Sequence, residues 1–300
     1  MITLYNKIYR KIGGRLYYRF PHLRNCMPDK MYLQHYFAQR MGYYMDFDNP
    51  RTFNEKLQWL KLYDRKPIYT TMADKIEAKK WVAERIGEQH IIPTLGVYNS
   101  FDEIDFEKLP SQFVIKCSHD SGSVVICRDK QSFDFHKARN VIETGLHRNW
   151  YLIGREWAYK NIKPRILIEQ FMKDSCDELT DYKFYCFNGV PEFLYVSMGL
   201  ANHDTAFINY LSLDWKKTPF HRPDFQEFKE LPPPPYSFEK MVSLSEKLSK
   251  DIPFLRVDFY EIDKKVYFSE LTFYPGCGMT PFVPEEWDEK CGNLIILPYR

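Results

Sequence analysis

The chain has 300 residues, of which 44% are hydrophobic, and it carries 42 basic against 40 acidic side chains. That length and apolar share suffice for one large or two modest cores and exclude a disordered or fibrous protein. A net charge of +2 gives no argument for nucleic acid as a partner, and we expect none. The seven cysteines are odd in number and include no C-x-x-C pair, which favours a reducing compartment over a disulfide framework or a zinc knuckle.

The first 27 residues are basic and amphipathic. Six Lys and Arg side chains precede the first acid, Asp29, and apolar residues recur among them at helical spacing. Such a helix either docks on the protein's own core or lies on an anionic membrane surface, and the sequence leaves both alternatives open. No apolar run approaches the ~18 residues of a spanning helix, and no signal-peptide core follows. We therefore expect a cytoplasmic protein, with residues 1–27 as its candidate contact with the inner membrane face.

Helical patterns dominate the first quarter of the chain. Apolar residues of the run from Thr52 to Leu60 fall on one helix face, and a second helix is predicted over residues 72–87, ending at Gly87 as its C-cap. Residues 112–117 and 124–127 then form a predicted hairpin with a small, polar tip. We assign residues 1–70 to a helical N-terminal segment and residues 71–165 to a small β-rich lobe.

Residues 166–300 are predicted to form a larger β-rich lobe. Strands are expected at 166–171, 182–187 and 192–198. The prolines at 232–235 lead into a helix over 237–250, and a hairpin of residues 254–260 and 266–273 follows. The fold class is therefore α+β.

This last hairpin carries the strongest chemical signal. Arg256 and Asp258 share one face of the first strand, and Glu270 and Thr272 share one face of the second. With a turn centred on Lys264, the two carboxylates stand opposite one another at ~5 Å, where like charges repel. Such a pair needs a cation, and hard oxygen ligands on rigid strands suit Mg²⁺. The alternative is a pair of solvent-facing acids in a surface salt bridge with Arg256.

A second signal is a lysine that ends an apolar strand. Lys116 precedes a loop of small residues that includes Ser121 and Gly122, whose backbone N–H groups can approach anionic oxygens. The sequence contains no Walker loop, and no G-x-G-x-x-G motif follows a predicted strand. Taken alone, a lysine beside such a turn is more often a surface residue than a phosphate ligand.

The order of these features resembles that of the ATP-grasp superfamily, and specifically its teichuronopeptide-biosynthesis-like branch of capsule and cell-wall polysaccharide enzymes. The resemblance extends from about residue 32 to residue 281. Its specific marks are the phrases F-N-E-K-L-Q-W-L-K, D-Y-K-F-Y-C-F-N-G and E-L-T-F-Y-P-G. It implies two β-rich lobes that clamp ATP together with Mg²⁺.

The resemblance also implies roles for individual residues. Nucleotide contacts are expected from phosphate-binding lysines, a hinge whose backbone meets adenine, and a ribose-binding acid. The phosphate-binding lysines are Lys75 and Lys116, the hinge is formed by Glu169, Gln170, Phe171 and Met172, and the ribose-binding acid is Asp181. Lys183 also reaches the phosphates, and Arg256 steadies the transferring phosphate. The residues that match the metal ligands are Asp258, Glu270 and Thr272. Thr272 departs from the asparagine that D-alanine ligases carry at its position, and a helical N-terminus replaces their Rossmann-like domain.

The implied reaction is ATP-dependent joining of a carboxylate to an amine through an acyl phosphate. For this branch we expect a uronic acid on a glycan or sugar nucleotide as the carboxylate and an amino acid or other amine as its partner. Residues Gly276 to Gly278 are candidates for presenting backbone N–H groups to the oxyanion. The rival function is a glycosyltransferase, supported by Asp46-Phe47-Asp48 as a metal-binding D-x-D, although a turn before Asn49-Pro50 also explains that pattern.

Overall fold

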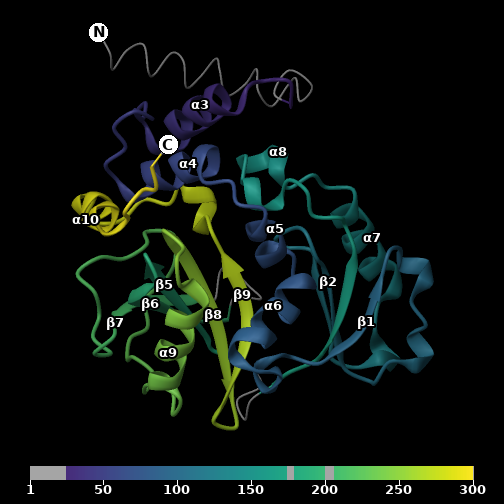
Figure 1. Cartoon of the computed structure of the whole chain (residues 1–300). Helices are drawn as coiled ribbons and strands as arrows, with labels where there is room; N and C mark the ends of the chain where they lie inside the picture. The colour runs from purple at the N-terminus through teal and green to yellow at the C-terminus, as the bar shows by residue number, and fades with distance from the viewer. Residues whose placement is uncertain (1–24, 174–178, 200–205, 300) are drawn as a thin grey trace.

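The computed structural model describes residues 25–173, 179–199 and 206–299, which form two antiparallel sheets with helices around them (Figure 1). The helices are α3 (Asp29–Met41), α4 (Phe53–Tyr63), α5 (Ile68–Ala73), α6 (Glu77–Ile86), α7 (Phe135–Leu146), α8 (Tyr151–Gly154), α9 (Phe238–Ser249) and α10 (Glu286–Leu294). The strands are β1 (Thr94–Tyr98), β2 (Phe113–Cys117), β3 (Val124–Cys127), β4 (Ile166–Gln170), β5 (Asp181–Phe187), β6 (Val190–Met198), β7 (Phe207–Ser212), β8 (Phe254–Ile262) and β9 (Lys265–Thr272).

The smaller sheet has the strand order β1-β4-β2-β3. Side chains alternate along its strands, so one face of β2 carries Phe113 and Ile115 while the other carries Lys116. The first face packs with Ile142 of α7 in a hydrophobic cluster of its own. The face that carries Lys116 is therefore the one left for polar chemistry.

The larger sheet has the strand order β7-β6-β5-β8-β9. Its apolar face, which includes Phe184, is covered by α9, where Phe238 packs against that ring. The opposite face carries Lys183 and Asp258, which are direct cross-strand partners. Figure 1 shows β8 and β9 as the strands of this sheet nearest to α6 and the smaller sheet.

Helix α4 supports the end of the larger sheet. Its N-terminus is a capping box, in which the Thr52 hydroxyl accepts from the backbone N–H of Glu55 at 3.2 Å and Glu55 Oε2 accepts from the Thr52 N–H at 3.0 Å. The helix packs against α10 and against the turn Pro275–Gly278 that follows β9. The described part of residues 1–70 thus holds α3, α4 and the first residues of α5.

The predicted helix over residues 72–87 is wrong in one respect, because it is broken between α5 and α6. Asp74 Oδ1 accepts from the Ile76 N–H at 2.9 Å, while the Lys75 N–H donates to the carbonyl of Ser118 at 3.1 Å. The local bond to Asp74 and the tertiary bond to Ser118 replace helical ones. The tertiary bond ties the backbone of Lys75 to the loop that follows Lys116.

Other sequence predictions are confirmed with small changes. The strands predicted at 166–171, 182–187 and 192–198 correspond to β4, β5 and β6, whereas β1 and β7 were not predicted. The predicted lobe boundary before Ile166 needs correction, since β4 pairs with β1 and β2 in the smaller sheet. The strands of the larger sheet begin only after β4, but α5 and α6 already pack in the core of that sheet, so the predicted start of the smaller lobe at residue 71 is also wrong. The predicted amphipathic helix of residues 1–27 lies, except for its last three residues, outside the described residues.

Candidate active site

The predicted carboxylate pair exists, and a β-bulge produces it. From Ile262↔Lys265 to Phe259↔Phe268 the β8–β9 pairing follows one register, and it then shifts so that Asp258 stands opposite Glu270. Without the extra residue in β9, Asp258 would oppose Ser269. Bulges of this kind re-aim side chains next to functional sites.

Asp258 is fully buried and is balanced by basic side chains of the same sheet. Arg256 donates from Nε to Oδ1 at 2.8 Å and from Nη2 to Oδ2 at 2.7 Å, and Lys183 donates to Oδ2 at 3.2 Å. Lys183 also donates to Asp181 at 2.6 Å. Although burial opposes it, the pair of carboxylates raises the pKa of Lys183 well above its usual value. Arg256 and Lys183 therefore supply positive charge beside the carboxylate pair. Because Asp258 is buried, the alternative of a surface salt bridge with Arg256 is excluded.

Glu270 is the more accessible of the two acids, with 31% of its side chain exposed. Lys75 approaches its Oε1 at 3.6 Å and Arg256 its Oε2 at 3.6 Å, while Thr272 Oγ1 accepts from Arg256 at 3.0 Å. Burial would raise the pKa of Glu270, but Lys75 and Arg256 outweigh it and hold that pKa below its usual value. Lys75 thus links the smaller lobe to the carboxylates of the larger sheet.

Lys116 lies on the polar face of the smaller sheet, beside Glu169. Their ion pair measures 2.7 Å, and a second lysine, Lys79 of α6, contacts Glu169 at 2.5 Å. Burial lowers the pKa of Lys116, but Glu169, Tyr260 and Glu270 together raise it by more, so the ammonium stays charged. Lys79 was not predicted. A continuous helix over residues 72–87 would place Lys79 on the same face as Lys75, and this spacing is the sequence signal that could have identified it, although the helix is broken at Lys75.

The predicted hinge of residues 169–172 is divided between the end of strand β4 and the segment that follows it. Glu169 is paired with Val114 and with Thr94, and the Gln170 N–H donates to the carbonyl of Pro93 at 3.0 Å. Their backbone is therefore committed to β4 and its neighbours, and the side chain of Glu169 to lysines. Phe171 and Met172 follow the strand, so the adenine contact stays a prediction for these two.

Hydrogen bonds hold the base of the loop that follows Lys116. Ser123 Oγ donates to Asp120 Oδ2 at 2.5 Å, and Lys75 Nζ donates to the Asp120 carbonyl at 2.5 Å. Ser121 and Gly122 at the tip are exposed, and Gly122 has a φ of 96°, which favours glycine. An exposed tip on a fixed base is consistent with the predicted phosphate contact.

The turn after β9 is held by two residues of the F-N-E-K-L-Q-W-L-K phrase whose role was not predicted. Buried Lys61 donates to the carbonyls of Cys277 at 2.8 Å and Gly154 at 2.9 Å, and Gln58 donates to the carbonyl of Gly278 at 2.6 Å. The turn has positive φ values of 58°, 60° and 60° at three successive residues, 276 to 278. Since this backbone is unusual for Cys277, its conformation depends on α4.

The side chains of the site offer the type of ligand atom that Mg²⁺ prefers, but too few ligands to complete its coordination. Asp258, Glu270 and Thr272 offer only oxygen ligands, as Mg²⁺ prefers. In the described part of the chain, no group of three or more His, Cys, Asp and Glu residues could hold a metal ion by itself. A Mg²⁺ ion here would therefore depend on phosphate oxygens and water for its remaining ligands.

The D-x-D of the rival function forms a local turn. Asp46 Oδ1 accepts from the Asp48 N–H at 2.9 Å, and Phe47 between them is buried. This is the turn that the sequence offered as the alternative explanation. In addition, no helix of the described residues is long and apolar enough to cross a membrane.

Two β-rich lobes that face each other, with lysines on one and carboxylates on the other, are the arrangement of the ATP-grasp class. A family profile for TupA-like ATPgrasp proteins matches residues 55–296. Because the match covers most of the chain, the protein belongs to this family, and the predicted ATP-grasp fold is confirmed.

Solved structures of similar fold include amino acid ligases. D-alanine–D-alanine ligase from Bacillus anthracis in complex with ATP is 17% identical (TM-score 0.39; 68% of this chain and 54% of that chain). An L-amino acid ligase from Bacillus licheniformis is 14% identical (0.42; 75% and 49%), and D-alanine–D-alanine ligase from Helicobacter pylori is 16% identical (0.43; 82% and 66%). The chain thus spans about half to two thirds of these proteins. A search of curated proteins finds no match to this chain.

Proposed function

We propose that the protein is an ATP- and Mg²⁺-dependent ligase that joins a carboxylate to an amine. The observation that carries this proposal is the convergence of basic side chains from both lobes on one pair of acids. Lys75 reaches Glu270 from the break between α5 and α6, and Lys116 of the smaller sheet is close enough to lower the pKa of Glu270. Arg256 and Lys183 hold Asp258 from within the larger sheet. Cations gathered in a partly desolvated cleft stabilise the charge that spreads over a transferring phosphoryl group.

Each residue has a distinct task in this mechanism. Lys116 and Lys75 bind phosphate oxygens, Lys116 from the strand and Lys75 from the break between α5 and α6. Arg256 orients the acceptor carboxylate and stabilises the phosphoryl group as the carboxylate oxygen attacks. ADP leaves as the acyl phosphate forms. The amine then attacks the acyl carbon, loses a proton and displaces phosphate, while the backbone of residues 276–278 receives the oxyanion. Mg²⁺ bound at Glu270 and Asp258 would offset phosphate charge.

The acceptor in this proposal is a uronic acid of a capsular or cell-wall polysaccharide precursor, and the product is its amide with an amino acid or another amine. Support comes from membership of the TupA-like family and from the sequence resemblance to polysaccharide enzymes. The proposed location is the cytoplasm, where residues 1–27 would bring the enzyme to lipid-linked precursors at the inner membrane face.

The test is an incubation of the full chain with ATP, Mg²⁺, uronic acids and a mixture of amines. We expect ADP and phosphate to form only when a carboxylate acceptor is present, and hydroxylamine to trap the acyl phosphate as a hydroxamate. Mass spectrometry should find the amide. Release of AMP would refute the acyl-phosphate route, and consumption of a sugar nucleotide without ATP would favour the glycosyltransferase.

A further inference from the structure

A small pocket lies next to the proposed site, on the same face of the larger sheet. Tyr185 of β5 is the direct cross-strand partner of Arg256, and Arg256 pairs in turn with Thr272. Tyr185 and Tyr210 line this pocket, and their hydroxyls are 3.4 Å apart. The pocket is therefore the continuation of the Arg256 row, away from the lysines of the smaller lobe.

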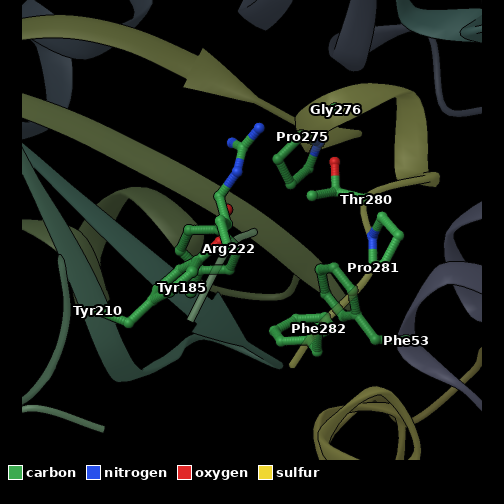
Figure 2. Close-up of a pocket in the computed structure, with 9 residues that line it drawn as sticks. All are labelled: Phe53, Tyr185, Tyr210, Arg222, Pro275, Gly276, Thr280, Pro281 and Phe282. Atoms are coloured by element: carbon green, nitrogen blue, oxygen red, sulfur yellow. The ribbon is translucent and has the colours of Figure 1, made fainter. Parts of the chain in front are cut away.

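The walls of the pocket come from distant parts of the chain (Figure 2). The aromatic rings of Phe53, Tyr210 and Phe282 are buried around it, and Gly276 contributes the turn predicted to hold the oxyanion. The enclosed part of the pocket has room for about one water molecule, and most of the empty space around it is open to solvent at the mouth. A ligand can therefore place only a small polar group in the pocket, while its body stays at the mouth.

One charged side chain, Arg222, enters this aromatic pocket. Figure 2 shows it extending from the side of Tyr185 and Tyr210 toward Pro275 and Gly276. Its side chain is only 19% exposed. Asp224 accepts from Nε at 2.9 Å and from Nη2 at 2.6 Å, and within the described residues no acceptor bonds to Nη1.

The remaining edge of Arg222 defines the ligand. A guanidinium presents two parallel N–H donors on each free edge, which match the two oxygens of a carboxylate. Asp224, whose side chain is 45% exposed, occupies one edge from the solvent side. The edge with Nη1 stays available, and the guanidinium extends toward Pro275 and Gly276 (Figure 2), whereas the aromatic rings are buried against one another.

We propose that Arg222 binds a carboxylate of a small substrate at the mouth of this pocket, with the body of the substrate outside it, beside the exposed residues Gly276 and Pro281. This inference rests on the proposed ligase function, because it makes the pocket a subsite for one of the two molecules that are joined. Two sources carry this chemistry: the uronic acid, and the α-carboxylate of an amino acid that serves as the amine. The position beside Gly276 brings either one to the proposed reaction centre.

Matched acid and neutral probes separate these sources. Saturation-transfer NMR on the full chain with ATP and Mg²⁺ would compare D-glucuronate with D-glucose, and L-phenylalanine with L-phenylalaninamide. We expect one acid to bind and its neutral partner not to bind. Arg222→Gln should weaken that acid at least tenfold, whereas Arg40→Gln, on the exposed surface of α3, should not. Asp224→Asn should strengthen it, since a competing carboxylate is removed.

Two controls keep the inference distinct from the ligase proposal. Thermal unfolding should show that the Arg222→Gln and Asp224→Asn variants are folded, and calorimetry should give an ATP affinity within twofold of the unmodified protein. Failure of ATP binding in the unmodified protein would refute the ligase proposal. Normal ATP binding with no binding of either acid, or with equal binding to the Arg222→Gln variant, would overturn the pocket assignment alone.

Discussion

Replacing the two opposed carboxylates should have very different effects on stability. If they mainly repelled each other, Asp258→Asn and Glu270→Gln would both stabilise the metal-free protein. The contacts predict otherwise for Asp258, which is fully buried and accepts from Arg256 at 2.8 and 2.7 Å and from Lys183 at 3.2 Å. Removal of one partner from a buried ion pair costs ~3–5 kcal/mol.

The partners that remain reduce this cost. Lys183 keeps Asp181 at 2.6 Å, and Arg256 keeps Thr272 at 3.0 Å, so we expect a loss of about 2–3 kcal/mol in the free energy of unfolding. At ~2–4 °C per kcal/mol this lowers Tm by roughly 5–10 °C. Glu270 has its nearest cations at 3.6 Å and is partly exposed, so Glu270→Gln should cost only ~0–1 kcal/mol.

Urea unfolding, followed by tryptophan fluorescence without nucleotide and with a chelator, measures both changes. The matched control is Glu286→Gln, an exposed acid of α10 that pairs with Lys290 within one helix. An Asp258→Asn variant that is as stable as the unmodified protein would refute the ion-pair argument. Both variants should lose ATP turnover, because both acids are proposed to bind Mg²⁺.

Four further predictions follow from the described contacts. Lys116→Ala and Lys183→Ala should each weaken ATP binding at least tenfold in calorimetry; affinities within twofold of the unmodified protein would contradict the phosphate assignment. Lys61→Met should lower the rate of ADP formation more than the ATP affinity, since Lys61 holds the turn at Cys277, and a parallel loss of both would contradict this role. Burial raises the pKa of Asp288 to about 6, so the folded protein binds a proton that the unfolded chain releases near pH 4, and stability falls as pH rises between these values. Asp288→Asn should remove up to ~3 kcal/mol of this dependence, measured by unfolding at pH 4 and pH 7. Finally, a chain without residues 1–27 should float less with anionic liposomes than the full chain does at low salt; equal flotation would disprove the membrane contact.

The sequence predicted local patterns better than contacts between distant residues. The sequence placed Asp258 opposite Glu270 by assuming a turn centred on Lys264, whereas the strands pair from Ile262↔Lys265 and a bulge without a sequence signature restores the opposition. The helix break at Lys75 could not be predicted, because it depends on a bond to Ser118, which belongs to another element. Similarly, Glu169 fitted a hinge by its position in the chain, and only strand pairing places it beside Lys79 and Lys116.

Arg222 illustrates why the remaining part of the site needed the structure. In the sequence it lies two residues from Asp224, a spacing typical of an exposed local ion pair that contributes little to stability. Its environment becomes distinctive only because the register of β5, β6 and β7 brings Tyr185 and Tyr210 to the same face as Arg256. An arginine at the surface and an arginine beside an aromatic pocket cannot be distinguished in the sequence, because they differ only in how much water surrounds the guanidinium. Since desolvation strengthens its hydrogen bonds to a carboxylate, burial beside the proposed reaction centre, rather than charge alone, makes Arg222 a candidate for binding substrate.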